Sequence, residues 1–232
     1  MKLSIIVPCY NEEKNISLIL NKFNEVIKRD DIEVVLVNNG STDNSQKVFD
    51  ELVPNFKFAR VLNVAVNEGY GHGIVSGLKS GKGEFIGYTH ADMQTDPKDV
   101  LTALEIIEKQ NDPSQCYVKG DRKGRPFFDQ FFTSGMSLFE SIYMRKKLWD
   151  INAQPNIFHR NFFESLTDTP KDFSLDLFFL YKAQIHKLDI IRFDVTFPER
   201  VHGESSWNTG FSAKWKFIKR TLEFSIKLKK EL

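Results

Sequence analysis

The chain has 232 residues, of which 41% are hydrophobic and 27% charged, so a disordered tract is excluded and a sizeable buried core is possible. The formal net charge of +1 gives no chain-wide electrostatic reason to bind nucleic acid. Two cysteines, Cys9 and Cys116, cannot build a disulfide framework or a four-cysteine zinc site, and a reducing cytosol is the expected compartment.

The first half of the chain alternates strand-like and helix-like segments. Short runs rich in β-branched residues are separated by segments whose apolar residues recur at helical spacing. Strands separated by helices predict βαβ units and a mostly parallel, doubly wound α/β sheet, in which ligands bind beyond the carboxyl ends of the strands. The expected strands are 3–7, 33–37, 58–64 and 84–88, and the expected helices are 12–29, one from Ser41 or Asp43 to Leu52, 71–80 and 96–110.

The pattern changes after residue 120, where 16 of the 21 phenylalanines lie. The mostly apolar segment 127–149 is predicted to be helical, with a break at Gly135. A further helix is expected at 171–186, a strand at 190–197 and a polar loop at 198–210. No internal repeat is seen, and we expect a single domain over 1–213 with an elaborated, Phe-rich second half.

An acidic loop, His90-Ala-Asp-Met-Gln94, follows the fourth expected strand. Hard divalent cations take oxygen ligands, and Mg²⁺ is usually shared between one or two carboxylates and substrate phosphates. The alternative is an exposed loop in which Asp96 caps the next helix.

Three further polar segments are compatible with ligand binding. The turn from Asn38 to Asp43 could hold a nucleobase or ribose, or be a plain turn, since Asn and Gly favour turns. The glycine-rich run 69–73 resembles a phosphate cradle at a helix start, but it does not follow the first strand as a dinucleotide fingerprint should. The segment 199–206 carries Arg200, whose planar donors suit phosphate oxygens, or is a solvated loop.

Taken together, these segments resemble the family 2 glycosyltransferases with a GT-A fold. The closer resemblance is to the branch of dolichyl-phosphate mannose synthase and the bacterial polyprenyl-phosphate sugar transferases. The matching segments, in the order of the family, are SIIVPCYNEE (4–13), VLVNNGSTD (35–43), NEGYG (67–71), GKG (81–83), HADMQ (90–94), NAQPNIF (152–158) and RVHGES (200–205).

The resemblance implies an inverting, metal-dependent transfer of a sugar from a nucleotide-sugar donor, with Mn²⁺ or Mg²⁺ as cofactor. It implies that the metal is held by Asp92, Gln94 and His90, and that Asp92, Asp176 and Arg200 are catalytic. Arg200 and the metal would neutralise the diphosphate as it leaves. The nucleotide-sugar-binding residues that it implies are Pro8, Tyr10, Glu12, Asn39, Gly69, Asp92, Arg200 and Ser205.

Two family carboxylates are replaced in this chain. His90 stands where the acidic signature usually begins with Asp, and because imidazole is a softer ligand we expect Mn²⁺ to be preferred over Mg²⁺. Asn38-Asn39 stands where the family usually has Asp-Asp. An amide both accepts and donates, so UDP is the favoured donor nucleotide while GDP and CDP stay possible.

The expected acceptor is a polyprenyl phosphate at the cytosolic face of a membrane. A hydroxyl acceptor would need a base, for which Asp176 is the candidate, whereas a phosphate acceptor is already ionised. The alternatives are a soluble or cell-surface glycan acceptor, or a catalytically weak nucleotide-sugar-binding subunit, which the substitutions at His90 and Asn39 would suit.

The tail 214–232 holds seven Lys and Arg against two Glu and reads as a basic amphipathic helix. Such a helix could lie at a membrane surface, giving peripheral contact, or pack its apolar side on the protein. No run of about 18 apolar residues predicts a spanning helix, and no secretory signal is expected at the N-terminus.

Overall fold

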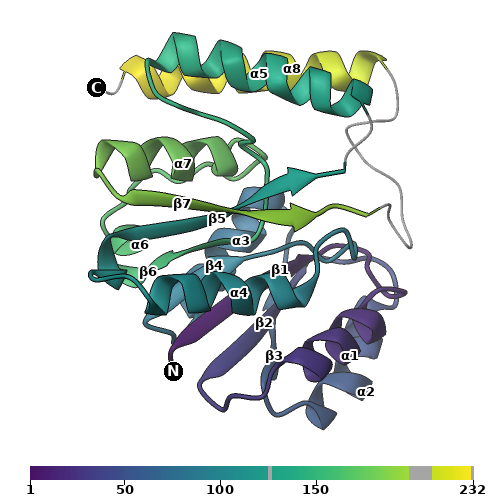
Figure 1. The fold of residues 1–232 in the computed structure, drawn as a ribbon. Helices are drawn as coiled ribbons and strands as arrows, with labels where there is room; N and C mark the ends of the chain where they lie inside the picture. The colour runs from purple at the N-terminus through teal and green to yellow at the C-terminus, as the bar shows by residue number, and fades with distance from the viewer. Residues whose placement is uncertain (125–126, 199–210, 231–232) are drawn as a thin grey trace.

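The computed structural model describes residues 1–124, 127–198 and 211–230, with the side chains of 127–132, 211–217 and 230 outside the description. Seven strands form one sheet in the order β3-β2-β1-β4-β6-β5-β7 (Figure 1). The strands are β1 (Leu3–Cys9), β2 (Ile32–Asn39), β3 (Ala59–Val64), β4 (Phe85–Tyr88), β5 (Cys116–Lys123), β6 (Asn156–His159) and β7 (Asp189–Thr196). The helices are α1 (Ile16–Val26), α2 (Ser45–Leu52), α3 (Tyr70–Ser80), α4 (Pro97–Glu108), α5 (Phe127–Met144), α6 (Arg160–Glu164), α7 (Leu175–Ile185) and α8 (Phe211–Lys230).

Strand β6 runs antiparallel to both of its neighbours, β4 and β5. The other strand pairs are parallel, so the mostly parallel sheet expected from the sequence is confirmed. The carboxyl ends of β1, β2 and β4 therefore meet at one edge, where three of the predicted polar loops begin.

Two hydrophobic cores cover the two faces of the sheet. Residues alternate between faces along a strand, so Ile5 of β1 packs in the core with α1, α2 and α4, whereas Ile6 packs in the other. This second core also contains α3, α6 and α7. The many phenylalanines of the second half supply much of it, including Phe158, Phe178 and Phe179.

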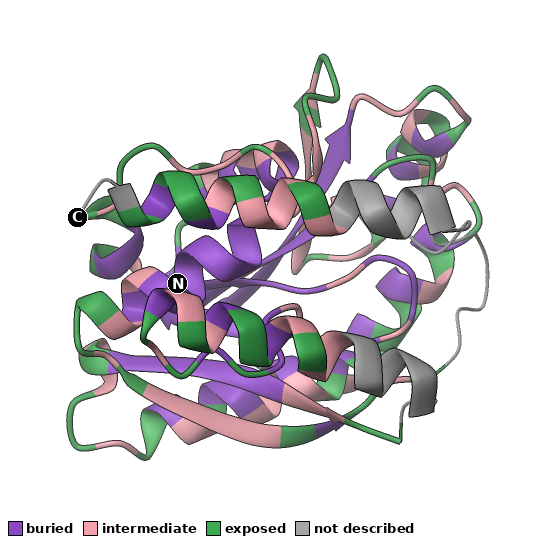
Figure 2. Ribbon diagram, turned by 90° about the horizontal axis from the view of Figure 1, so that it is seen from above, coloured by how far each residue is buried: buried purple, intermediate pink, exposed green. Residues whose placement is uncertain are grey.

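Helices α5 and α8 form an outer layer over α7, visible at the top of Figure 1. Leu228 of α8 is buried, and the Phe224 ring packs against Phe178 of α7 at 6.4 Å. Helix α8 thus packs part of its apolar side on the protein. Figure 2 shows that the outward sides of both helices remain largely exposed.

Several expected boundaries were wrong. Helix α5 is not broken at Gly135, where an added Cβ would meet nothing within 4 Å, and it ends at Met144 before Arg145 with φ 52°. Helix α7 begins only at Leu175, because residues 170–172 pack as irregular backbone against α3. Helix α1 begins at Ile16 rather than residue 12, and the backbone N–H groups of Glu12 and Glu13 before it donate to the side chains of Ser45 and Asp43.

Strands β5 and β6 were not expected at all. Strand β5 carries Lys119, Asp121, Arg122 and Lys123, so its composition does not read as a strand. Strand β6 has only four residues and follows a proline. Both are specified by their neighbours in the sheet rather than by local pattern.

Candidate functional site

The loops after β1 and β2 are bonded together through Asn11. Its side-chain oxygen accepts hydrogen bonds from the backbone N–H of Thr42 at 2.8 Å, and its own N–H donates to the Ser41 hydroxyl at 3.1 Å. Asn11 adopts φ 57°, a left-handed conformation that Asn tolerates better than most residues. The predicted residues Pro8, Tyr10 and Glu12 lie on this joined edge, with Tyr10 exposed and the Glu12 carboxylate accepting from Asn15 at 2.6 Å.

Asn38 and Asn39 have different roles at the end of β2. The Asn38 side chain closes the turn, donating to Gln46 at 2.7 Å and accepting from the Ser41 N–H at 3.2 Å. Asn39 is 3% exposed, and its amide nitrogen donates to the carbonyl oxygen of Gly69 at 3.0 Å. A carbonyl oxygen can only accept, so this bond fixes which end of the Asn39 amide is which.

The side-chain oxygen of Asn39 is left buried without a hydrogen-bond partner. Buried polar atoms are rarely unpaired, so such an atom calls for an explanation. The unsatisfied group is an acceptor, in the position that the family resemblance assigns to base recognition. The Asn39 amide therefore has its nitrogen bonded to Asn67 and Gly69, and an unpaired oxygen that is shielded from solvent.

The glycine-rich run at the start of α3 serves chain packing. A Cβ on Gly69 would lie 2.4 Å from the carbonyl oxygen of Lys171, and one on Gly71 would lie 2.4 Å from that of Pro170. The N–H of His72 donates to the same Lys171 oxygen at 2.9 Å, and the rings of Tyr70 and Phe173 stack at 4.7 Å. Because these glycines have no side chain, the segment before α7 can pack directly against α3. This packing accounts for the glycine-rich run without a role in phosphate binding.

The acidic loop after β4 is closed by its own side chains. The hydroxyls of Thr89 and Thr95 lie 2.9 Å apart, and Asp92 accepts from the backbone N–H of Gln94 at 3.1 Å. The Gln94 amide nitrogen donates to the carbonyl oxygen of Pro198 at 3.1 Å, which ties the loop to the chain after β7. Asp92 is 6% exposed, so its carboxylate is held in a fixed place.

The possible metal ligands of this loop fit a cation whose remaining ligands come from a bound substrate. It offers one carboxylate, Asp92, with the Gln94 amide and the His90 imidazole nearby in sequence. No group of three or more His, Cys, Asp or Glu able to hold a metal occurs among the described residues. A cation here would need phosphate oxygens to complete its shell, which is how Mg²⁺ and similar ions usually bind with nucleotides.

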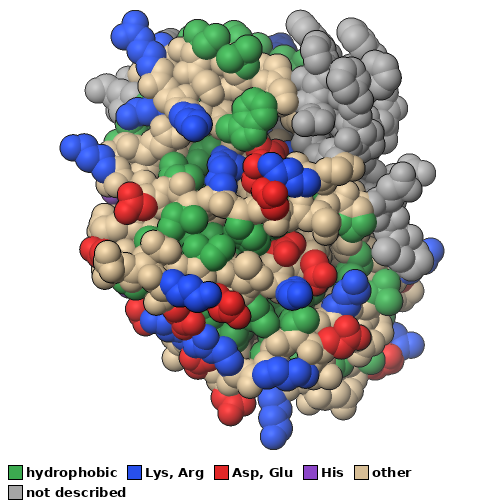
Figure 3. All heavy atoms as spheres, in the orientation of Figure 1, with side chains coloured by type: hydrophobic (Ala, Val, Ile, Leu, Met, Phe, Trp, Pro, Cys, Tyr) green, Lys and Arg blue, Asp and Glu red, His purple; other side chains and the backbone are tan. Residues whose placement is uncertain are grey.

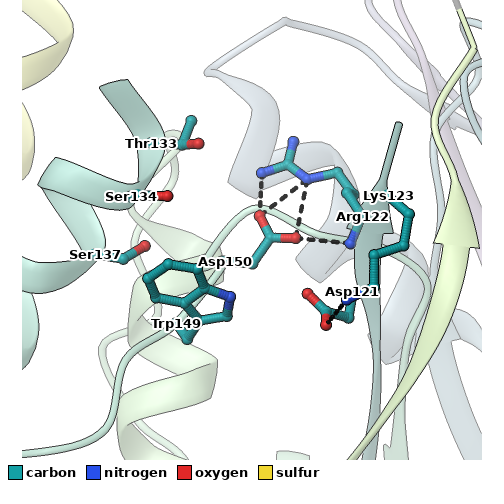
Figure 4. A pocket seen from close by; sticks show the side chains of 8 residues that line it. All are labelled: Asp121, Arg122, Lys123, Thr133, Ser134, Ser137, Trp149 and Asp150. Carbon is teal, nitrogen blue, oxygen red and sulfur yellow. Dashed lines mark hydrogen bonds and ion pairs between the residues drawn. The ribbon is translucent and has the colours of Figure 1, made fainter. Parts of the chain in front are cut away.

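A small cavity of about 90 Å³ lies under α5 at the end of β5 (Figure 4). Arg122 and Asp150 form one wall, with the guanidinium donating to both carboxylate oxygens and the Arg122 backbone N–H donating at 2.9 Å. Burial alone would raise the pKa of Asp150, but the hydrogen bonds from Arg122 outweigh it, so that pKa is lowered. The hydroxyl-bearing residues Thr133, Ser134 and Ser137 line the opposite side.

Phe197 connects this cavity to the acidic loop. Its ring lies 5.2 Å from the Arg122 guanidinium carbon and 6.4 Å from the His90 ring. The cavity was not predicted from the sequence, because β5 was missed. The cationic run Lys-Gly-Asp-Arg-Lys at 119–123, just before a helix with hydroxyl residues, was the signal that could have located it.

Three predicted residues are not on the loops described above, although Asp176 bonds to Tyr88, the last residue of the strand before the acidic loop. Asp176 lies in the first turn of α7 and is 3% exposed, where it accepts from the Tyr88 hydroxyl at 2.7 Å. Arg200 and Ser205 lie outside the described residues, and their roles stay predictions.

Residues 4–166 match the sequence profile of a family described as glycosyl transferase family 2. The chain is 25% identical over 211 residues to the dolichol-phosphate mannosyltransferase of Pyrococcus furiosus, covering 88% of this chain and 59% of that protein. It is 29% identical over 115 residues to the undecaprenyl-phosphate 4-deoxy-4-formamido-L-arabinose transferase of Proteus mirabilis, covering 48% and 35%. The chain thus spans less than two thirds of the length of these relatives.

Solved structures share the fold at low sequence identity. Glucosyl-3-phosphoglycerate synthase of Mycobacterium tuberculosis, in complex with Mn²⁺, uridine diphosphate and phosphoglyceric acid, superposes with a TM-score of 0.75 at 15% identity. The alignment covers 95% of this chain and 76% of that one. The likeness shows the same α/β architecture around the sheet.

Proposed function

Because the chain belongs to glycosyl transferase family 2, we propose that it moves a sugar from a nucleoside-diphosphate donor to a polyprenyl phosphate, inverting the anomeric carbon. The observation that carries the proposal is the convergence of three parts at one edge. These are the buried acceptor atom of Asn39, the closed loop of Asp92, and the Arg122 cavity that Phe197 links to that loop.

The donor nucleotide is proposed to be UDP. The free atom of the Asn39 amide is an oxygen, which can accept from the ring N–H of uracil. Cytosine presents an unprotonated ring nitrogen there, and the Asn39 nitrogen that could donate to it is already bonded to Gly69. Guanine also has a ring N–H but is larger, so GDP ranks second. The solved relative with bound uridine diphosphate agrees with this choice.

The diphosphate is proposed to lie beside the acidic loop, with Asp92, Gln94 and His90 holding Mn²⁺ or Mg²⁺. When bound, the cation neutralises charge that develops on the departing diphosphate. Asp92 supplies the fixed negative charge, and the Gln94 bond to Pro198 keeps the loop against the chain after β7. Arg200, two residues beyond Pro198, stays the predicted partner of the diphosphate oxygens.

The acceptor phosphate is proposed to enter the cavity under α5. Arg122, Lys123 and the hydroxyls of α5 supply donors to the cavity, which a phosphate would share with the Asp150 and Asp121 carboxylates that also line it, and the cavity adjoins the acidic loop through Phe197. An ionised phosphate can attack the anomeric carbon from the face opposite the leaving group without first losing a proton.

Peripheral contact with the cytosolic face of a membrane is proposed for the outer layer. Leu138 and Ile142 of α5 are 60% and 70% exposed, and Ile226 of α8 is 44% exposed. Exposed hydrophobic side chains appear at the upper rim of Figure 3, where this layer lies. Arg145 and Lys146 follow Ile142 along the chain, and Lys227 and Lys229 follow Ile226; basic residues beside exposed apolar ones favour anionic lipid surfaces. None of the described helices is long and apolar enough to cross a membrane.

The test is a transfer assay with UDP-sugars, Mn²⁺ and a polyprenyl phosphate in vesicles, reading sugar carried into the organic phase. The matched acceptor is the same polyprenol without its phosphate, which should receive no sugar. Asp92→Asn, whose side-chain oxygen can still accept from the Gln94 N–H, should abolish the transfer while leaving the thermal unfolding temperature nearly unchanged. Transfer to a glycan but not to the lipid phosphate would overturn the proposed acceptor, and nucleotide binding without any turnover would favour a binding subunit.

A further inference from the structure

Trp149 is an exposed tryptophan at the rim of the cavity under α5. Its side chain is 43% exposed, although tryptophan is highly buried on average in folded proteins. The residue also lines the cavity, and Figure 4 shows its indole between the side chains of α5 and those of β5. The indole is therefore in contact with both the cavity and the solvent.

The backbone around Trp149 is held by three elements, so its exposure does not result from a loose turn. The N–H of Leu148 donates to the Ser141 hydroxyl of α5 at 2.9 Å, and Leu148 itself is fully buried. Arg192 of β7 donates to the carbonyl oxygen of Trp149, and the next residue, Asp150, is hydrogen-bonded to β5. The chain thus presents the indole at a fixed place beside the cavity.

Trp149 is the one apolar residue among the described residues that line this cavity, since the other lining side chains are charged or carry a hydroxyl. The charges are balanced, because Lys123 bonds to Asp121 at 2.7 Å and Arg122 bonds to Asp150 at 3.0 Å. The cavity therefore has little net attraction for an anion. Its hydrogen-bond donors alone do not distinguish a lipid phosphate from free phosphate, so a preference must come from contact with the rest of the acceptor.

The cavity is too small to hold more than the head of a lipid. Its volume of about 90 Å³ corresponds to about six waters at about 15 Å³ each, which suits a phosphate group. A second cavity of about 30 Å³ shares Arg122, Thr133 and Ser137 with it and is lined further by apolar side chains such as Leu177, but about two waters would fill it. A branched isoprene unit does not fit there. The chain attached to the phosphate must then leave along the rim, where the indole lies.

We propose that the Trp149 indole contacts the first isoprene units of the acceptor and selects a lipid phosphate over a water-soluble one. The proposal rests on the proposed function and adds the residue that decides which phosphate is accepted. An indole suits this position because its ring is apolar while its N–H can stay in water. Covering the exposed ring with hydrocarbon supplies the preference that the balanced charges do not.

Kinetic constants with a short acceptor test this contact without a membrane. Farnesyl phosphate, a short polyprenyl phosphate, is offered in vesicle-free solution with the UDP-sugar and Mn²⁺. Trp149→Ala should raise KM for farnesyl phosphate about tenfold, which corresponds to about 1.4 kcal/mol, and should leave KM for the UDP-sugar and the unfolding temperature nearly unchanged. Trp149→Phe keeps an aromatic ring and should recover most of the affinity. An unchanged KM for farnesyl phosphate in Trp149→Ala would overturn the contact.

Phe139→Ala is the matched control for loss of an exposed aromatic ring. Phe139 is 46% exposed, stacks on Tyr143 with ring centres 6.0 Å apart, and is not among the residues that line the cavity. Without vesicles this change should alter neither KM value. Equal increases in Trp149→Ala and Phe139→Ala would show that the effect does not belong to the rim of the cavity.

Indole fluorescence gives a result that does not depend on turnover. The chain has three tryptophans, so the difference in emission between the wild type and Trp149→Phe isolates the signal of Trp149. Farnesyl phosphate should move that signal to shorter wavelength, because hydrocarbon replaces water around the indole, whereas inorganic phosphate should not. An equal shift with the UDP-sugar alone would assign the indole to the sugar, and an equal shift with vesicles that lack the acceptor would assign it to the membrane. Either result would overturn the proposal.

The two measurements also separate this contact from the proposed function. If farnesyl phosphate shifts the emission of Trp149 but no sugar is transferred to any polyprenyl phosphate, the proposed function fails and the lipid-phosphate contact stands. If sugar is transferred to farnesyl phosphate without a shift, the contact fails and the proposed function stands.

Discussion

At residue 39 an amide replaces the carboxylate that the family resemblance implies, and its orientation decides what it can recognise. The sequence left that choice open, because an isolated Asn can both donate and accept. The structure commits the donor end to Gly69 and leaves the acceptor end buried and unpaired. No local pattern could have given this, since the partner lies 30 residues further along the chain.

We therefore predict that UDP binds about 5- to 150-fold more tightly than CDP, since an unpaired buried polar group costs about 1–3 kcal/mol. Isothermal titration calorimetry with both nucleotides and Mn²⁺ measures the difference. Asn39→Ala should reduce it to nearly nothing, whereas the exposed Asn55→Ala should leave it intact. Equal affinities in the wild-type chain would contradict this account of base recognition.

Glu140 illustrates a second single-residue effect, on the contact between α5 and α8. Its side chain is 0% exposed, one oxygen accepts from the Ser225 hydroxyl of α8 at 2.6 Å, and the other is buried without a hydrogen-bond partner. Burial raises the pKa of Glu140. The folded chain therefore holds this proton more tightly than the unfolded chain does.

From the sign of that shift, Glu140 should stabilise the fold most below its unfolded pKa, about 4.5. The contribution should be lost as the pH rises through the raised folded pKa. Urea unfolding of wild type and Glu140→Gln at a series of pH values measures it, because the glutamine cannot ionise. The wild-type free energy of unfolding should fall relative to the variant as pH increases, and parallel curves would refute the assignment.

At the scale of elements, the packing of α3 against the segment before α7 depends on glycines without side chains. Alanine favours a helix over glycine by about 1 kcal/mol, but an added methyl group at Gly71 would lie 2.4 Å from a backbone carbonyl. Overpacking typically costs about 1–3 kcal/mol, so the clash should win.

Gly71→Ala is thus predicted to lower the free energy of unfolding by about 1–2 kcal/mol. Gly135→Ala is the matched change in α5, where the methyl group meets nothing within 4 Å, and it should raise that free energy by up to about 1 kcal/mol. Chemical unfolding of both variants provides the measurement. A stabilised Gly71→Ala would show that the segment before α7 is not packed tightly there.

The elements that sequence reasoning missed share a physical cause. In the regular half of the chain, with β-branched strands and amphipathic helices, each strand and helix was predicted in its place, with the largest boundary error at α1. Strand β5 was not, because four of its eight residues are charged and two of those, Lys119 and Arg122, are compensated by distant partners. Such residues become compatible with a strand only after the chain has folded around them.

At the scale of the whole molecule, the loops proposed to hold the nucleotide were predicted better than the cavity proposed to hold the acceptor. The loops after β1, β2 and β4 come from the regular half, so their convergence followed from the expected topology. The cavity under α5 combines β5, a helix that begins at residue 127 as predicted but ends at Met144 rather than at residue 149, and Asp150 at φ 38°. The cavity forms only through tertiary contacts between these segments, so it cannot be predicted from any one of them alone.

The outer layer of α5 and α8 leads to a prediction about association. The whole chain should float with vesicles that contain anionic lipids, and Leu138→Ser/Ile142→Ser should lose most of that binding. Val66→Ser is the matched control, because this residue is 65% exposed and lies far along the chain from the layer. Added salt should weaken binding through the lysines. If the double variant floats as well as the wild type, α5 does not contribute to vesicle binding.

The reversed direction of β6 has a consequence for how such a protein could diversify. Since β5 and β6 are adjacent and antiparallel, the chain that leaves the sheet after Lys123 comes back beside the same strand at Asn156, which pairs with Lys119. The segment between β5 and β6, which includes α5, could be replaced by a segment of different length without changing the order of the parallel strands. Replacing this segment with the corresponding segment of a relative should change which acceptor is used. The preference for the sugar donor should stay the same.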